Sequence, residues 1–462
     1  MMICLGACGE GSSIRDSELA VTHRNFQEPR SVIFITIDTL RADRLSSYGY
    51  ARDISPRIEG LAEEGVVFEQ AFAQRGLTWP SLTSIMTSRY PSDHGVRDNG
   101  EWLAKSKMTL AQVLRDAGFD TAAFLTNMTN APHRGFEHLE VFPVDSELAS
   151  RDRPTDLLAT EAAIRWLEQV GERRIFLWLH LLGPHAPYSP PSEFTTRFAQ
   201  DDLPFDGEME TLWEITSGDR EPRPGEIEAI QALYDAEIAF VDQLVGRVLD
   251  RVEQLGLADT TLIVFSADHG EELFDRQRYF FHQCSIYDSV LRLPLILRLP
   301  QAIDPGMRSD AIVQSLDIAP TIVELLGLPA AEFRGRSLVP LLQQLPTPVE
   351  NVEGAAFSEL GVDIFSIRTS EWRLITNPHD TRIRAGGRES TSRCYRIGET
   401  ELYDLRVDAS ERRNVADEYP EVVARLQDRL AQWLQTTPQE TRRQETIPEE
   451  TLEELRALGY LQ

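Results

Sequence analysis

The strongest constraint on the fold is a set of short, mainly apolar segments, several of which end next to polar residues. Residues 31–38 (SVIFITID) form the first, a run rich in β-branched residues that closes on an aspartate. Continuous runs of this kind are typical of strands buried on both faces of a sheet. Similar segments recur at residues 121–125, 174–180, 260–266 and 293–297.

Segments with helical periodicity lie between these apolar runs. They cover residues 55–64, 80–89, 109–117, 155–170 and about 225–255. Strands that alternate with helices predict an α/β fold, with a mostly parallel central sheet flanked by helices. In such folds ligands bind beyond the carboxyl ends of the strands, so polar residues at those ends are the first candidates for a site.

The chain divides into three predicted parts: a tail at 1–30, a main α/β domain at 31–345 and a C-terminal α+β subdomain at 346–462. Prolines mark the second boundary, and shorter segments with turn residues follow it. They predict a small antiparallel sheet closed by a helix at about 420–434, with a further amphipathic helix at 448–458.

The tail contains Leu5-Gly6-Ala7-Cys8, which resembles the lipobox of bacterial lipoproteins. This predicts a lipid anchor at Cys8 and export to the periplasm or cell envelope. Only seven residues precede Cys8, none of them Lys or Arg, whereas a secretory apolar region needs about 7–15 residues. An accidental match in a soluble cytoplasmic protein is the alternative.

The net charge of −28 argues against a broad nucleic-acid-binding surface, because phosphate neutralisation needs a basic patch. No apolar run approaches the roughly 20 residues that span a bilayer. Four cysteines are too few for a disulfide framework. We interpret Cys284 and Cys394 as unpaired thiols, with a bridge between them as the alternative. The acidic segment 205–226 is interpreted as a solvated insertion.

Three polar residues follow predicted strands directly: Asp38, Asp268 and His269. Two histidines, His185 and His282, fall in neighbouring loops. Two carboxylates and an imidazole are suitable ligands for a divalent metal ion. A single aspartate at a strand end often only caps a helix, so the prediction depends on the set.

Thr78 is the candidate nucleophile, in Gly76-Leu77-Thr78-Trp79-Pro80-Ser81. Pro80 suits a first helical position, which would place Thr78 at a helix N-terminus, where free N–H groups favour an anionic oxygen. Taken by itself, this segment rather favours a simple helix cap. Ser81 is the second candidate.

With these residues in view, the chain resembles the sulfatase family of the alkaline phosphatase superfamily nearly from end to end. Segments that match family signatures, in the family's order, are ITIDTLRADRLSSYGY, TWPSLTSIMTSRYPSDHGVRDNG, HLLGPHAPYSPP, TLIVFSADHGEELF, HQCSIYDSVLRLPLIL and ELYDLRVDASERRNVA. The resemblance implies that Asp38, Asp268 and His269 bind the metal, with Thr78 also facing it.

For the substrate side, the resemblance implies that His185 and His282 contact the transferred group or protonate the leaving oxygen. Asn99 is similar to a residue that touches the same group in some relatives. The plain alternatives are a loop histidine satisfied by local backbone for His185 and a turn residue for Asn99.

The departures from the family are informative. Sulfatases place a cysteine, oxidised to formylglycine, in Cys-x-Pro-Ser-Arg, and here Thr78 and Leu82 replace the cysteine and arginine. Threonine cannot become formylglycine, so none is expected. Asp-Asp in the first metal loop has become Asp38-Thr39. The combination resembles phosphoethanolamine transferases and phosphodiesterase-like members of the superfamily.

We therefore expect a metal-dependent hydrolase of sulfate or phosphate/phosphonate esters that uses Thr78 as its nucleophile. The cofactor would be one divalent ion, with zinc, manganese or magnesium favoured over calcium because imidazole suits softer cations. Fewer cationic groups would fit a diester or phosphonate monoester better than a phosphate monoester. The alternatives are a transferase acting on a lipid or glycan acceptor and a non-catalytic protein that binds a glycan or anion.

Overall fold

A computed structural model of the protein describes residues 29–126, 132–144, 146, 148–198, 207–276, 279–300, 302–329, 331–344, 354–379 and 397–440. The predicted anchor at Cys8, the predicted helix at 448–458 and the boundary at 345/346 lie outside these residues and stay predictions.

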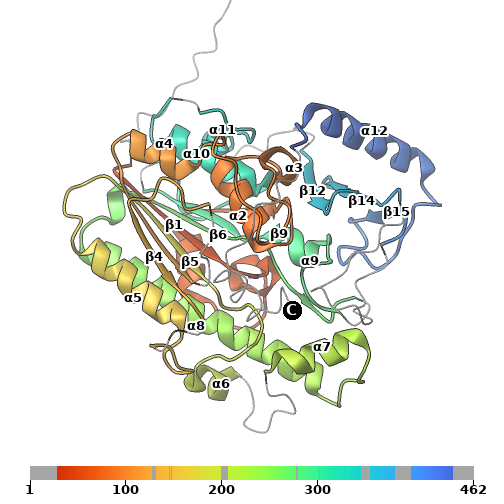
Figure 1. Ribbon diagram of the computed structural model, residues 1–462, viewed down its shortest axis with the longest axis horizontal. Coiled ribbons are helices and arrows are strands. Elements are labelled where there is room, and N and C mark those ends of the chain that lie inside the picture. Colours follow the sequence, from red (N-terminus) through yellow and green to blue (C-terminus); the bar gives the residue numbers. More distant parts are fainter. Residues whose placement is uncertain are drawn as a thin grey trace, which may run out of the picture.

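A nine-stranded sheet lies at the centre of the described part of the chain (Figure 1). Its strands run in the order β11-β2-β10-β6-β1-β5-β3-β4, and β9 pairs with β2. They are β1 Ser31–Ile37, β2 Val66–Phe72, β3 Asp120–Thr126, β4 His138–Phe142, β5 Ile175–Leu181, β6 Thr261–Ala267, β9 Arg292–Leu293, β10 Leu295–Arg298 and β11 Met307–Gln314.

Strand β1 lies in the middle of this sheet and pairs in parallel with β5 and β6. Every residue of β1, β5 and β6 is buried, as their continuous apolar sequences predict. The mostly parallel sheet is confirmed, but the strand predicted at 293–297 is divided. Pro294 lacks an N–H for the ladder, and β10 runs antiparallel to both β2 and β6.

Helices cover both faces of the sheet, with α5 and α8 on one side and α2, α4 and α10 on the other (Figure 1). The four predicted helices other than that at 80–89 are present with bounds shifted by a few residues. The helices are α1 Pro56–Glu63, α2 Thr78–Thr87, α3 Pro91–His94, α4 Leu110–Asp116, α5 Thr155–Leu167, α6 Ser192–Phe198, α7 Met209–Ser217, α8 Glu226–Gln254, α9 Asp288–Leu291, α10 Ile318–Leu325 and α11 Val339–Gln344. In the described part of the chain, none is long and apolar enough to cross a membrane.

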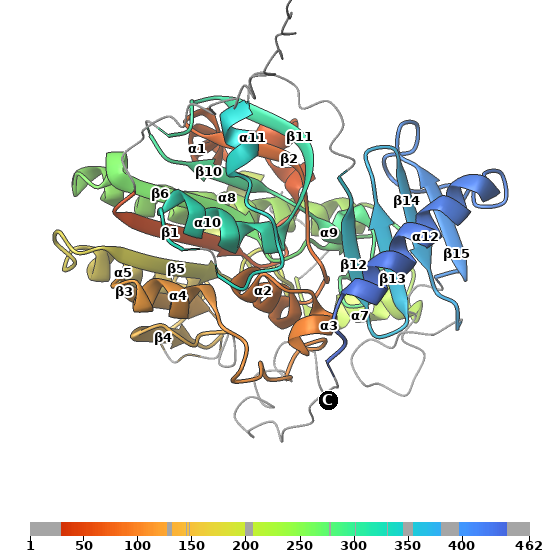
Figure 2. The ribbon, with the colours of Figure 1, turned by 90° about the horizontal axis from the view of Figure 1, so that it is seen from above.

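A second, antiparallel sheet stands beside the large one, next to α9 (Figure 2). Helix α12 (Pro420–Thr436) packs on it, and the Trp433 ring stacks on Phe357 with centroids 4.9 Å apart. This confirms the predicted C-terminal sheet and helix. The strands are β12 Ala356–Leu360, β13 Ile364–Arg368, β14 Trp372–Thr376 and β15 Thr400–Asp404.

The acidic segment 205–226 contains helix α7, which buries Leu212 and Ile215, while Glu208, Glu210, Asp219 and Glu221 are exposed, so the segment is solvated on one side and packed on the other. The interpretation of Cys284 as an unpaired thiol is wrong. Cys284 is buried and forms a disulfide, although its partner lies outside the described residues. A short two-stranded sheet, β7 (Glu272–Leu273) with β8 (Phe280–Phe281), precedes this cysteine.

Candidate active site

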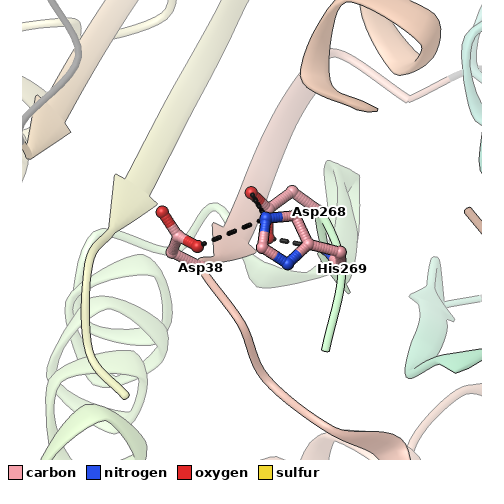
Figure 3. Close-up of side chains that lie close together, drawn as sticks. All are labelled: Asp38, Asp268 and His269. Carbon is pink, nitrogen blue, oxygen red and sulfur yellow. Dashed lines mark hydrogen bonds and ion pairs between the residues drawn. The ribbon is translucent and has the colours of Figure 1, made fainter. Parts of the chain in front are cut away.

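Asp38 and Asp268 follow the two central strands β1 and β6 directly. The parallel register pairs Ile37 with Ala267, so the next residue of each strand lies at the same point of the sheet edge. His269 follows Asp268, and the three side chains converge (Figure 3). One ligand atom from each lies within 4.8 Å of the others. The structure thus brings together the three strand-end residues that the sequence singled out.

The donor atoms of this cluster suit a cation. His269 Nδ1 lies 2.9 Å from the carbonyl oxygen of Gly270, so Nδ1 carries the proton and Nε2 has a lone pair. That Nε2 lies 3.4 Å from Asp268 Oδ2 and 3.7 Å from Asp38 Oδ1. Both carboxylate oxygens are buried and accept no hydrogen bond from any described residue. These residues fit a divalent metal ion.

The pKa values of Asp38, Asp268 and His269 also indicate a site for a cation. Burial, together with the charges of Asp268 and Glu271, raises the pKa of Asp38 well above its ordinary value. Burial also raises the pKa of Asp268, against hydrogen bonds from the N–H groups of His269 and Thr39. The pKa of His269 is lowered well below its ordinary value by burial. Bringing two carboxylates together in a buried place is unfavourable without a positive charge.

Thr78 begins helix α2, two residues earlier than the predicted start at Pro80. Pro80 is tolerated there because the first N–H groups of a helix have no intrahelical partner. The Thr78 hydroxyl donates to Asp38 Oδ2 at 3.4 Å and lies 3.3 Å from His269 Nε2. Thr78 therefore faces the carboxylate–imidazole cluster, and the hydroxyl is not the cap of its own helix.

Asn99 and Ser81 hold the start of helix α2 in place. Asn99 Oδ1 accepts a hydrogen bond of 3.1 Å from the N–H of Trp79, so its amide group lies at the start of α2. Ser81, the second candidate nucleophile, donates to the backbone oxygen of Asp268 at 2.5 Å. That bond fixes α2 against the end of β6 and occupies the Ser81 hydroxyl.

His185 and His282 lie beside the cluster of Asp38, Asp268 and His269. Their ring centroids are 5.3 Å apart, and the His282 ring lies 4.3 Å from that of His269. His185 Nδ1 donates to the carbonyl oxygen of Ala186 at 2.5 Å. One nitrogen of His185 is therefore satisfied by the local backbone, as expected for an ordinary loop histidine. The His185 ring nevertheless lies against that of His282.

Behind His282 lies Glu271, which the sequence analysis did not single out. Its Oε1 is 2.9 Å from His282 Nδ1, and Oε2 has no partner among the described residues. Burial raises the pKa of Glu271 to about 8 and lowers the pKa of His282 to about 3. A protonated Glu271 donates to Nδ1 and leaves the proton of a neutral His282 on Nε2.

Two more residues at the strand ends have a conformation or contacts that the sequence did not predict. Thr39 has φ of 54°, a left-handed conformation that is unfavourable for a β-branched residue, and its N–H donates to Asp268 Oδ1 at 3.2 Å. His180, at the end of β5, is fully buried with Nε2 3.9 Å from Asp38 Oδ2. The sequence places His180 at the end of the predicted strand 174–180, although it was not among the predicted metal ligands.

Comparison with protein families and curated proteins supports the family expected from the sequence. The family model described as Sulfatase matches residues 30–328, and that described as N-sulphoglucosamine sulphohydrolase, C-terminal, matches residues 276–381. An N-acetylglucosamine-6-O-sulfatase of Bacteroides thetaiotaomicron is 23% identical over 516 aligned residues, which cover 91% of this chain and 88% of the relative.

Solved structures share the fold. A phosphonate monoester hydrolase from Silicibacter pomeroyi superposes with a TM-score of 0.73 at 22% identity, covering 91% of this chain and 98% of the other. A structure described as a complex with its substrate D-glucosamine-2-N,6-O-disulfate gives a TM-score of 0.70 at 22% identity, covering 88% and 98%.

Proposed function

The chain belongs to the sulfatase family of sulfuric ester hydrolases, and on that premise we propose a metal-dependent hydrolase that uses Thr78 as its nucleophile. Its substrates would be sulfate or phosphate/phosphonate esters. The observation that carries the proposal is the position of the Thr78 hydroxyl, 3.4 Å from Asp38 and 3.3 Å from His269, at the start of a helix.

Asp38, Asp268 and His269 would hold the metal ion. When bound, such an ion lowers the pKa of a nearby hydroxyl and neutralises charge on the transferred group. Thr78 Oγ would attack sulfur or phosphorus as its proton passes to Asp38 Oδ2, which accepts its hydrogen bond, and the bond to the ester oxygen would break. The group would stay on Thr78 until water, giving its proton to His282 or His185, displaces it and Thr78 Oγ takes a proton back. A threonine ester cannot release the group by collapse to an aldehyde, so this second step requires water.

His282 is the proposed proton donor to the leaving oxygen. A neutral imidazole with its proton on Nε2 can donate that proton while it receives another at Nδ1 from Glu271. His185, whose ring stands beside that of His282, is the second candidate and is placed to contact the transferred group. Asn99 orients the start of α2, on which Thr78 stands.

The proposed substrate class is taken from the names of the similar proteins. One is described as acting on a sulfated amino sugar and another as hydrolysing phosphonate monoesters. Both kinds of ester carry a single negative charge on the group that is transferred. We propose the same class here, on a small molecule or a glycan.

The test is a rate comparison among wild type, Thr78→Ala, Thr78→Ser and Thr87→Ala. Each protein is supplied with zinc, manganese, magnesium or calcium and assayed on aryl sulfate, aryl phosphate, phosphodiester and phosphonate monoester. Thr87 is the matched control, because it is buried in the same helix and donates to the carbonyl oxygen of Thr83.

We expect Thr78→Ala to reduce kcat/KM by about 10³-fold or more on the preferred ester, with Thr78→Ser intermediate and Thr87→Ala close to wild type. An active wild type whose rate survives Thr78→Ala would contradict the nucleophile. A wild type that hydrolyses no ester with any of the four metals would favour a transferase or a non-catalytic binding protein.

We also propose that the protein is exported and held at the cell envelope by a lipid on Cys8. Two features support this: the segment Leu5-Gly6-Ala7-Cys8 and the disulfide at Cys284, since disulfides persist in oxidising compartments. Expression in a bacterial host with a labelled fatty acid tests it. Wild type should take up the label and Cys8→Ser should not, and an unlabelled wild type would contradict the anchor.

A further inference from the structure

Arg75 lies in the loop that joins β2 to α2, three positions before Thr78. Its side chain is only 6% exposed. One terminal nitrogen donates to the backbone oxygen of Gln283 at 3.3 Å, while Nε has no hydrogen-bond partner among the described residues. A guanidinium with five N–H donors thus makes few protein contacts for a group so deeply buried.

No described carboxylate forms an ion pair with Arg75. Asp98 and Glu359 are the acidic residues whose charges act on it. Asp98 is exposed, and Glu359 Oε1 accepts hydrogen bonds from the N–H and hydroxyl of Ser92. A buried cation without a paired anion is unfavourable, and burial lowers the pKa of Arg75 to about 10. Among the described residues, therefore, no carboxylate pairs with the Arg75 guanidinium, which leaves its N–H groups available to an anionic ligand.

Arg75 stands beside the candidate active site. Gln283, whose carbonyl oxygen it contacts, follows His282 in the chain. Gly76, the next residue, lies against the same segment, because a Cβ built on it would be in ordinary contact with the carbonyl oxygen of His282, at 3.5 Å. After burial, the positive charge of Arg75 is a further cause of the lowered pKa of both His282 and His269.

The position at which the resemblance to sulfatases implies an arginine is taken by Leu82. This side chain is fully buried in the hydrophobic core of the large sheet and its helices. The chain therefore lacks a cation at that point of α2, and Arg75 offers one from the loop that precedes the same helix.

We propose that Arg75 binds the anionic group of the substrate ester and takes over the charge that Leu82 cannot provide. This inference rests on the proposed ester hydrolysis and adds a residue to it. The planar guanidinium donates two parallel N–H groups, which match two oxygens of a tetrahedral sulfuryl or phosphoryl group.

The same charge argument narrows the substrate class. A bound divalent ion would offset the two charges of Asp38 and Asp268, so that Arg75 adds one positive charge to the site. A group with one negative charge, as in a sulfate monoester or phosphonate monoester, balances that charge, whereas the dianion of a phosphate monoester leaves a negative charge without a partner. Arg75 therefore selects singly charged groups.

The test measures binding of inorganic sulfate to the full chain by titration calorimetry, together with KM and kcat on aryl sulfate and aryl phosphate. The variants are Arg75→Gln and Arg75→Lys. The matched control is Arg336→Gln, since Arg336 also donates to a backbone carbonyl, that of Ile312, and is in no part of the candidate site.

Arg75→Gln should weaken sulfate binding and raise KM for aryl sulfate by about 10- to 100-fold, as expected for loss of a charge-assisted hydrogen bond. For Arg75→Lys, the sulfate affinity and the KM should lie between those of Arg75→Gln and wild type. Arg336→Gln should match wild type in both. A folded Arg75→Gln variant that binds sulfate as wild type does would overturn the inference. If that variant does not fold, Arg75→Met, which keeps the buried aliphatic stem, decides in the same way.

Failure of the inference is distinct from failure of the proposed function. If Thr78→Ala abolishes hydrolysis and Arg75→Gln alters neither KM nor sulfate binding, the nucleophile stands and Arg75 is only structural. If wild type neither binds sulfate nor hydrolyses any ester, the proposed function fails and the role of Arg75 fails with it.

Discussion

Asp38, Asp268 and His269 extend from the ends of two adjacent strands, whereas His185, His282 and Arg75 come from three separate loops. The first group is positioned by the parallel register of β1 with β6, which repeats along seven buried residue pairs. The second group is positioned by side chains that hold the loops. The site thus has a strand wall and a loop wall, defined by these two sets of residues.

Two buried carboxylates hold the part of the loop wall that carries His185. Asp156 accepts hydrogen bonds of 2.8 Å from the N–H groups of Leu182 and Gly183, and Glu237 accepts one of 2.9 Å from Ser189. These bonds enclose the loop that carries His185. The strand wall is positioned by the sheet itself, and the loop wall by individual side-chain contacts. Substitutions in the two walls should therefore have effects of different size and on different properties.

The largest effect is expected in the strand wall. Asp268→Asn removes a ligand and should lower kcat/KM on the preferred ester by about 10³-fold or more, since central catalytic groups contribute on this scale. It should also abolish the rise in Tm that metal produces in wild type. Without metal, the variant should melt no lower than wild type, because a buried carboxylate that repels Asp38 is gone.

The control is Asp259→Asn, an exposed aspartate in the turn before the other end of β6. It should change neither the rate nor the response to metal. If Asp268→Asn still gains Tm from metal as wild type does, the strand wall is not the metal site.

In the loop wall, His282→Asn should lower kcat/KM by about 10²-fold or more on esters with poor leaving groups, the usual range for loss of a general acid. The loss should shrink on a nitrophenyl ester, whose leaving oxygen needs little protonation. The comparison is His138→Asn, a partly exposed histidine that pairs with Glu140 away from the site. An equal loss on all leaving groups would show that His282 acts through binding or structure.

Glu271→Gln tests the support behind His282. The amide can still form a hydrogen bond with Nδ1 but cannot supply a proton, so we expect a loss of about 10-fold, confined to poor leaving groups. The measurement is the slope of the logarithm of kcat/KM against the pKa of the leaving group, compared between Glu271→Gln and wild type. An unchanged slope would remove Glu271 from the proton path.

The smallest effect is one of stability, at Glu237. Burial, with the charge of Asp156, raises its pKa in the folded protein to about 8, above the ordinary 4.5. The folded state therefore binds more protons between these values, and the stability that Glu237 contributes is lost as pH rises from about 4.5 to 8.

The glutamine of Glu237→Gln does not titrate, so this loss should be absent from the variant. Between pH 5 and pH 8 the free energy of unfolding of the variant should therefore rise relative to that of wild type by on the order of 2 kcal/mol. Urea unfolding at the two pH values measures it. Glu226→Gln is the contrasting control, because Arg220 pairs with Glu226 and the pKa there is lowered. A constant difference between Glu237→Gln and wild type at both pH values would contradict the assignment.

The strand wall could be predicted from sequence because its signal is local. A continuous apolar run reveals a buried strand, and the first polar residue after it must lie at the sheet edge, which identifies Asp38 and Asp268. What the runs cannot reveal is which strands are neighbours, and the reversed direction of β10 was not foreseen. Thr39 gave no sign of its left-handed backbone, since a β-branched residue disfavours it.

The loop wall was only partly predictable for a related reason. His185 stood out as a histidine in a Gly/Pro-rich loop, and His282 as a histidine in a neighbouring loop. Arg75 and Glu271 look like ordinary charged residues in sequence, and their burial and neighbours arise only when segments far apart in the chain meet. Glu271 meets His282 across a short β-hairpin, and Arg75 meets Gln283 across 208 positions.

The most direct test of the central claim is to trap the covalent ester on Thr78. Wild type with metal is mixed with the preferred ester, quenched in acid within the first turnover, digested and analysed by mass spectrometry. We predict one added sulfuryl or phosphoryl group on the peptide that contains Thr78, absent from Thr78→Ala and present in Thr87→Ala. Rapid turnover with no modified Thr78 peptide at any quench time, or with the group on another residue, would contradict the account.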